Sequence, residues 1–140
     1  MARACAVRRV DVPLPSAWAA VADHVDMANW APGMAATMER LGNDDPNGVG
    51  AIRDITLPPG RHIREEITDF EPERRLGYRA LSGAAFPDWT GEVELAEHQG
   101  GTVIRWSLSC RSSIPGTSLF LRISALVMVS ALAKATKRKA

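Results

Sequence analysis

Apolar and polar residues alternate with a period of two through most of the chain, in short segments bounded by turn-forming residues. This alternation is typical of antiparallel strands that bury one face. Reversals such as Pro58-Pro59-Gly60 and Gly100-Gly101 separate the segments, since proline and glycine provide the backbone angles of tight turns. The predicted strands are Ala4 to Val12, Met34 to Leu41, Val49 to Leu57, Arg61 to Phe70, Arg75 to Leu81, Trp89 to Glu97 and Thr102 to Cys110.

The pattern changes to a helical period after Pro115 and Gly116, where Ser118 to Lys139 is predicted to form one long helix. Its apolar residues fall into two stripes. One stripe consists of Leu119, Ile123, Leu126 and Val127, and the other of Leu121, Ala125, Met128 and Leu132. We expect the first stripe to pack on the sheet. Two stripes are more than one sheet covers, so a homodimer or a partner helix is a candidate for covering the second.

Two shorter helical segments are expected after the first strand. Ser16 can cap a helix over Ala17 to Val25, and Met27 to Gly33 forms a short irregular or helical piece. A curved sheet wrapped around one long helix leaves an apolar hollow between them. The sequence therefore predicts a pocket.

The hairpin at Pro58-Pro59-Gly60 places a charged pair in this hollow. If Leu57 faces Arg61, the antiparallel register sets Arg53 opposite Glu65. Such a pair among apolar neighbours can recognise a ligand through the guanidinium and the carboxylate. It can equally be a structural pair that closes the wide end of the sheet, where water reaches it. The apolar residues that alternation assigns to the same face are Ala51, Ile55, Leu57, Ile63 and Ile67.

Further residues are expected to face the same hollow. Tyr78 shares the inward face of its strand, and its hydroxyl needs a partner if it is buried. Gly91 follows Trp89 on the next strand and leaves room for a ligand. Trp106 is expected to pack in the core, whereas Trp30 and Trp89 either frame an entrance or pack in the core.

Composition narrows the classes of function. The 140 residues suit a single domain, residues 1–140, and a net charge of +1 argues against nucleic-acid binding. The uncharged run Ile123 to Ala133 is too short to be an integral membrane segment. The N-terminus lacks the apolar core of a signal peptide, so we expect a cytoplasmic protein. The basic cluster from Lys134 to Lys139 complements the helix dipole, with a membrane-surface role as the weaker alternative.

Other catalytic and metal-binding patterns are absent from the sequence. His24, His62 and His98 occur singly and have no zinc-ligand spacing, so neither a metal nor a cofactor is expected. No serine has the sequence surroundings of a nucleophile elbow.

The order of these elements and several short motifs resemble the polyketide cyclase/dehydrase and lipid-transport family of the START/Bet v 1 (SRPBCC) superfamily. The motifs are Trp30-Ala-Pro32, Val49-Gly50-Ala-Ile-Arg53, Glu65-x-Ile67, Pro72-Glu-Arg-Arg-Leu76 and Thr102-x-Ile104-x-Trp106. The resemblance covers nearly the whole chain. It implies an α+β helix-grip fold, in which a seven-stranded antiparallel sheet wraps around the C-terminal helix and leaves a cavity for a hydrophobic small molecule. It implies no single reaction, because this fold hosts binders, carriers and enzymes.

Three functions therefore stay open. The first is binding or carriage of a lipid or polyketide-like compound. The second is a polyketide cyclase/dehydrase, in which Glu65 or Tyr78 transfers a proton and Arg53 stabilises an oxyanion. The third is a protein-interaction module that uses the long apolar helix. The residues expected to contact a ligand are Trp30, Met34, Arg53, Ile55, Leu57, Glu65, Ile67, Tyr78, Trp89, Gly91, Trp106, Ile123 and Val127.

Overall fold

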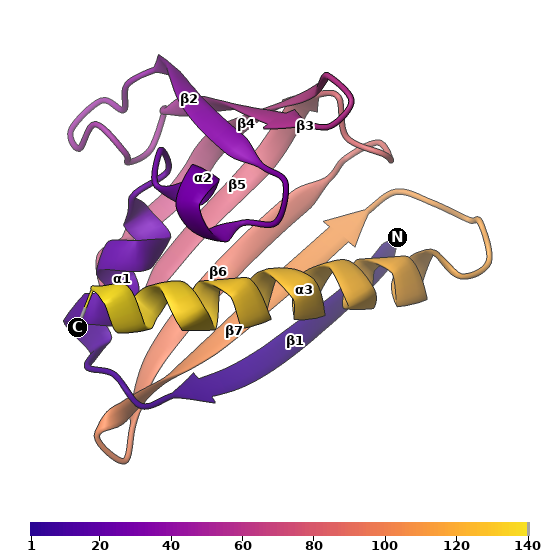
Figure 1. Cartoon of the computed structure of the whole chain (residues 1–140). Helices are drawn as coiled ribbons and strands as arrows, with labels where there is room; N and C mark the ends of the chain where they lie inside the picture. The colour runs from indigo at the N-terminus through magenta and orange to yellow at the C-terminus, as the bar shows by residue number, and fades with distance from the viewer. Residues whose placement is uncertain (140) are drawn as a thin grey trace.

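Strands and helices follow one another in the predicted order (Figure 1). The structure is a computed structural model that describes residues 1–139. Its elements are β1 (Ala2–Val10), α1 (Leu14–Ala22), α2 (Met27–Trp30), β2 (Ala35–Arg40), β3 (Ile52–Leu57), β4 (Arg61–Glu71), β5 (Arg75–Ser82), β6 (Thr90–His98), β7 (Gly101–Cys110) and α3 (Thr117–Arg138).

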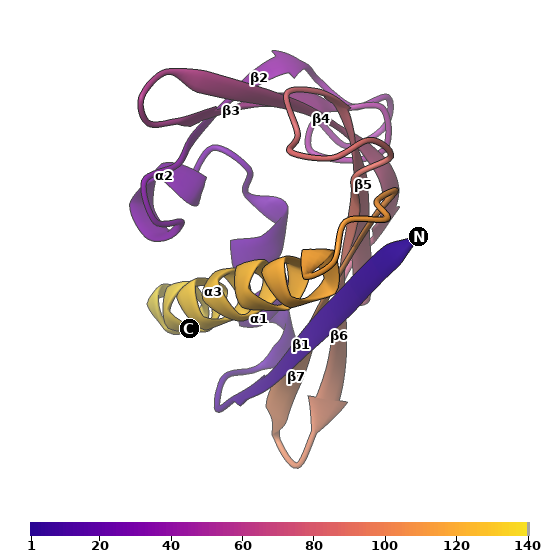
Figure 2. The same ribbon diagram turned by 90° about the vertical axis from the view of Figure 1, so that its right-hand side faces the viewer.

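The strands form one antiparallel sheet in the order β1-β7-β6-β5-β4-β3-β2. Strands β2 to β7 each lie beside the next in the chain, and β1 pairs with β7 at the other edge. The sheet is strongly curved: α3 lies against its concave side near β1 and β7, and β2 to β4 curve over the space above the helix (Figure 2). This arrangement confirms the predicted helix-grip fold.

The first helix begins earlier than the sequence suggested. α1 starts at Leu14 with Pro13 in the N-cap position, and no side chain caps it, so the expected cap at Ser16 is wrong. Pro15 lies in the first turn of the helix. Backbone N–H groups in the first turn have no partner within the helix, so the N–H that proline lacks costs no hydrogen bond. The helix also ends at Ala22, which leaves His24 in the connection to α2.

The long helix presents the opposite face to the sheet from the one predicted. Leu121, Ala125 and Leu132 are at most 1% exposed, whereas Leu119 and Ile123 are more than half exposed. Both stripes are apolar, so hydrophobic periodicity did not distinguish them. The small residues Ala125, Ala133 and Ala135 lie on the buried side, and a small side chain lets a helix approach its partner closely. The expected packing of the first stripe was therefore wrong.

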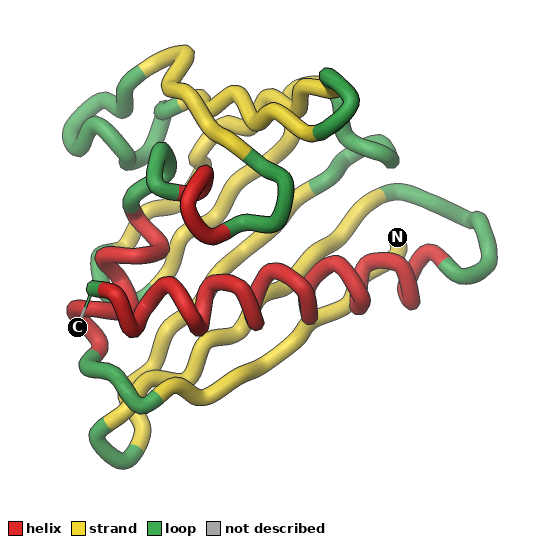
Figure 3. The backbone as a smooth tube through the Cα atoms, in the orientation of Figure 1, coloured by secondary structure: helices red, strands yellow, loops and turns green. Residues whose placement is uncertain are grey.

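The loops at one end of the sheet lie above the first turns of α3 (Figure 3). The β3–β4 turn and the β5–β6 loop meet there, because Arg61 donates hydrogen bonds from Nε and Nη2 to the backbone oxygen of Gly83 at 3.1 and 2.7 Å. A small core of Met27, Ala31, Ala36 and Ile55 packs α2 beneath β2 and β3. Together these contacts hold the curved part of the sheet away from α3 and leave a cavity.

Candidate functional site: a cavity between the sheet and the long helix

The cavity has a volume of about 180 Å³ and lies between the curved sheet, α2 and α3. Most of its wall is apolar. Its lining residues are Met27, Met34, Arg53, Ile55, Leu57, Arg61, Ile63, Glu65, Tyr78, Ala84, Ala85, Trp89, Trp106, Leu108, Phe120, Ser124 and Met128.

The exposure of the lining residues distinguishes the inner end of the cavity from its mouth. Arg53, Glu65 and Tyr78 are each at most 5% exposed, so the buried polar groups of the wall lie at the inner end. Arg61, Ala85 and Phe120 are exposed, which places the mouth between the two loops and the start of α3. A ligand would enter past apolar side chains and meet the polar groups last.

Arg53 and Glu65 form a buried ion pair at the inner end. They face each other across β3 and β4, as the sequence predicted. Arg53 Nε and Nη2 donate hydrogen bonds to the same oxygen, Glu65 Oε1, at 3.0 and 2.8 Å. The other oxygen, Oε2, accepts no hydrogen bond from any residue in the described range 1–139. Glu65 therefore keeps one acceptor oxygen unused by these residues while its charge is balanced by Arg53.

His24 completes this network, and the sequence analysis did not identify it. Its Nε2 lies 2.8 Å from the backbone oxygen of Asn47, and its Nδ1 lies 3.0 Å from Arg53 Nη1. A carbonyl can only accept a hydrogen bond, so Nε2 carries the proton and Nδ1 accepts from Arg53. The imidazole is thus neutral and holds the guanidinium from the side opposite Glu65. Its position after α1, in no recognisable motif, gave no sequence signal.

Tyr78 lies over the same pair. The guanidinium carbon of Arg53 is 4.8 Å from the centre of the Tyr78 ring, a cation–π contact. Trp106 Nε1 donates a hydrogen bond to the Tyr78 hydroxyl at 3.2 Å. Burial raises the pKa of this hydroxyl, the Glu65 charge raises it further, and Arg53 opposes both. Tyr78 therefore stays protonated, so its hydroxyl keeps a proton that it can donate and is poorly suited to act as a base.

Gly91 makes room for Tyr78 and not for a ligand. The two residues face each other across β5 and β6, and a Cβ added at Gly91 would overlap Cζ and Oη of the Tyr78 ring. Glycine at this position is what allows the ring to lie flat against the sheet. The space expected for a ligand at Gly91 is filled by the protein itself.

The structure brings eight of the predicted contact residues to the cavity wall. They are Met34, Arg53, Ile55, Leu57, Glu65, Tyr78, Trp89 and Trp106. Whether they bind a ligand remains a prediction.

The other five predicted contact residues lie elsewhere. Gly91 lies under the tyrosine ring, and Ile67 is fully buried in the main core. Ile123 and Val127 are on the exposed face of α3, because the helix is turned the other way from the prediction. Trp30 lies beside the cavity, next to His24 and Arg53, where its Nε1 has no partner among the described residues.

The cavity also uses residues that the sequence analysis did not propose. Its lining from α3 is the row Phe120, Ser124 and Met128, which are spaced four residues apart, and of these only Met128 belongs to a predicted stripe. Correct orientation of α3 would have identified this row. Ile63 lines the cavity, on the face that strand alternation assigned to it, and the other unpredicted lining residues are Met27, Arg61, Ala84, Ala85 and Leu108.

The neutral state of His24 makes stability depend on pH. Burial, and next the charge of Arg53, lower the pKa of His24 from 6.5 to about 4. The unfolded chain therefore binds more protons between these values, so stability is full above pH 6.5 and falls as the pH drops toward 4. We expect a loss from this group of roughly 1.5 kcal/mol between pH 6.5 and pH 5.

His24→Gln should flatten this dependence, since glutamine has no proton to gain and can keep part of the hydrogen bonding. Urea unfolding at several pH values measures the effect. His98→Gln, which changes an exposed histidine, is the control and should keep the full slope. Equal slopes in the wild type and the His24 variant would contradict the assignment.

Within residues 1–139 no group of three or more His, Cys, Asp or Glu side chains is placed to hold a metal ion. One helix of the described chain, α3, is long and apolar enough to cross a membrane by composition alone, with a mean hydropathy of 1.6 over its most apolar window. In this fold one side of that helix packs against the sheet, and 39% of that window is buried.

A curved sheet around a long helix, enclosing an apolar cavity, defines a START/Bet v 1-like domain. The chain belongs to the polyketide cyclase / dehydrase and lipid transport family, whose model matches residues 1–140. Comparison with curated protein sequences found no match.

Solved structures show the same fold. A START superfamily protein from Mycobacterium smegmatis superposes with a TM-score of 0.83 at 10% identity, over 99% of both chains. A protein from Nitrosospira multiformis gives 0.76 at 18% identity over 94% of both chains. Ara h 8.0201 gives 0.69 at 15% identity, over 96% of this chain and 93% of its own.

Proposed function

We propose that the protein binds a small hydrophobic compound whose hydroxyl group donates a hydrogen bond to Glu65 at the inner end of the cavity. The observation that carries the proposal is the convergence of apolar walls on a buried, charge-balanced pair with one free acceptor oxygen. Binding sites for small molecules are typically apolar with a few placed polar groups. The family description, which names lipid transport, supports the same class of function.

The size of the cavity limits the ligand. A cavity of roughly 150 Å³ in another protein holds benzene, so a volume of about 180 Å³ suits a single ring with a short substituent. A longer compound would have to extend through the mouth past Phe120 and Ala85.

The charge of the inner end selects a neutral polar group. Arg53 and Glu65 already balance each other, so a ligand carboxylate would bring an uncompensated charge into a buried site. A phenol or an alcohol adds no charge and supplies the donor that Glu65 Oε2 lacks. Hydrogen bonds to charged groups contribute about 1.5 to 3 kcal/mol.

The test compares three compounds of similar shape by calorimetric titration: 4-ethylphenol, ethylbenzene and 4-ethylbenzoate. We expect the phenol to bind about tenfold or more tightly than ethylbenzene, and the benzoate to bind more weakly than either. Ala85→Trp should obstruct the mouth of the cavity and weaken binding of the phenol. Ala96→Trp, at an exposed position of β6, should leave this binding unchanged. Tightest binding by the benzoate would reject the proposed polar contact.

A second candidate is the cyclase/dehydrase activity, favoured by the position of Tyr78 beside Arg53 and Glu65. In this reading Glu65 removes a proton from carbon next to a carbonyl. The protonated Tyr78 hydroxyl and the Arg53 charge stabilise the resulting enolate oxygen.

Two conservative variants separate the candidates. Glu65→Gln removes the base and should abolish turnover of a polyketide-like substrate, while binding of 4-ethylphenol changes only in affinity. Tyr78→Phe should slow turnover by roughly a hundredfold or more, as removal of an oxyanion donor does. Turnover that survives in both variants would exclude this catalytic assignment.

A further inference from the structure

The outward face of α3 carries a row of exposed aliphatic side chains. Leu119, Ile123, Leu126 and Val127 are between 43% and 62% exposed. Residues three and four positions apart share a helix face, and the same spacing continues this row through Ser130 to Lys134 and Lys137. Contiguous apolar surface of this kind marks an interaction site.

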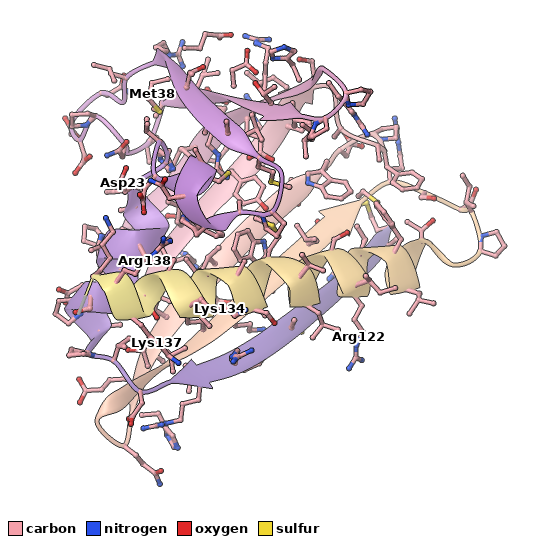
Figure 4. All side chains as sticks on the ribbon, in the orientation of Figure 1. Asp23, Met38, Arg122, Lys134, Lys137 and Arg138 are labelled. Atoms are coloured by element: carbon pink, nitrogen blue, oxygen red, sulfur yellow. The ribbon has the colours of Figure 1, made fainter. Side chains whose placement is uncertain are left out.

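The cations within α3 have no acidic partners among residues 1–139, whereas Lys139, just beyond the helix, pairs with Asp23 and Asp26. α3 contains no acidic residue. Its four cationic side chains project from the helix (Figure 4), and none of them forms an ion pair with any residue in the described range 1–139. They are Arg122, Lys134, Lys137 and Arg138.

Arg8 on β1, which forms no ion pair within residues 1–139, adds a fifth such cation beside the same helix. Its Nη1 lies 3.5 Å from Ser130 Oγ. By contrast, Arg40 on β2, Arg64 on β4 and Arg79 on β5 are each paired with a glutamate. A chain with a net charge of only +1 therefore concentrates unpaired positive charge around an apolar row.

We propose that this face docks the protein on an anionic lipid bilayer. The helix lies parallel to the surface, with Leu119, Ile123 and Val127 among the headgroups and the cations on lipid phosphates and carboxylates. An aliphatic row flanked by Lys and Arg is the pattern of interfacial helices, and each cation near an anionic membrane strengthens binding about fivefold.

Other occupants fit this face less well. A second copy of the chain would bring two sets of unpaired cations together, with no acid on the face to separate them. The centres of protein interfaces are enriched in aromatic residues and depleted of lysine, whereas this row is aliphatic and continues into Lys134 and Lys137. The charge pattern thus favours a bilayer over the homodimer considered from the sequence.

Docking would place the cavity near the lipid. Phe120, Ser124 and Met128 line the cavity from the side of α3 adjacent to the exposed row. The docking proposal goes beyond the proposed ligand binding and does not depend on it, because its test uses no cavity ligand.

The test is co-sedimentation of the full chain with phosphatidylcholine vesicles that either lack phosphatidylserine or contain it as about one third of the lipid. We expect binding to the anionic vesicles that weakens with added salt. The double variant Lys134→Glu with Lys137→Glu should bind at least tenfold more weakly. Arg105→Glu is the matched control, since Arg105 is exposed on β7 and unpaired among the described residues, and should change binding less than twofold.

A second pair of variants tests the apolar row. Ile123→Asn should lower vesicle binding several-fold, and Val7→Asn, an exposed aliphatic position on β1, should not. Circular dichroism establishes that each variant is folded. Failure of the wild type to bind anionic vesicles would overturn the proposal. So would a doubled mass in light scattering that reverts in Ile123→Asn, because the face would then be a dimer interface.

Discussion

Glu65→Ala is expected to lower the free energy of unfolding by about 3 to 5 kcal/mol in the absence of ligand. The change leaves the guanidinium of Arg53, which is 4% exposed, without its carboxylate in an apolar site. His24 cannot replace the carboxylate, because its neutral ring supplies no negative charge. For a chain of this length the midpoint of thermal unfolding should fall by about 10 °C or more.

The double variant Arg53→Met with Glu65→Leu is the control for this effect. Replacing both charges with apolar residues of similar size removes the buried charge, so much of the lost stability should return. Urea unfolding of the wild type, Arg53→Met, Glu65→Leu and this double variant measures the coupling. A loss below about 1 kcal/mol in Glu65→Ala would show that water solvates Arg53, and the inner end of the cavity would then not be the dry polar site described above.

Gly91→Ala is expected to be the second most damaging change, at about 3 kcal/mol. The added methyl group would overlap the Tyr78 ring. The ring must then leave its position over Arg53 and give up the hydrogen bond from Trp106. Binding of 4-ethylphenol should weaken as well, since Tyr78 forms part of the wall.

If the Tyr78 ring is removed, the methyl group of Gly91→Ala should no longer destabilise the protein. In a Tyr78→Ala background, Gly91→Ala should add less than about 1 kcal/mol, because the two effects share one cause. Differential scanning calorimetry of the single and double variants provides the comparison. Additive losses would mean that Gly91 is needed for some other reason than space for the ring.

The two-residue alternation of apolar and polar residues predicted most of the fold. Strand alternation and turn residues defined the sheet, and the register of one hairpin was enough to set Arg53 opposite Glu65. This pairing could be predicted because a two-residue period fixes both the face and the partner once the turn is known.

The orientation of α3 could not be predicted in the same way. Its two stripes are equally apolar, and the choice between them depends on how closely the helix backbone approaches β1 and β7. Because the wrong stripe was placed on the sheet, Ile123 and Val127 were wrongly predicted to contact a ligand. For the same reason Phe120, Ser124 and Met128 were not predicted to line the cavity. His24 was missed for a different reason, because its partners Arg53 and Asn47 come from segments far away in the sequence.

The most direct test of the central claim is a methyl NMR titration of protein labelled at its methionines. Three of the five methionines, Met27, Met34 and Met128, line the cavity, whereas Met1 and Met38 lie outside it and serve as internal controls. The signals of the three cavity methionines should shift together and reach saturation as 4-ethylphenol is added, with Met1 and Met38 unchanged. Saturating shifts confined to Met1 or Met38, or no shifts up to the solubility limit of the phenol, would contradict a hydrophobic-ligand site in this cavity.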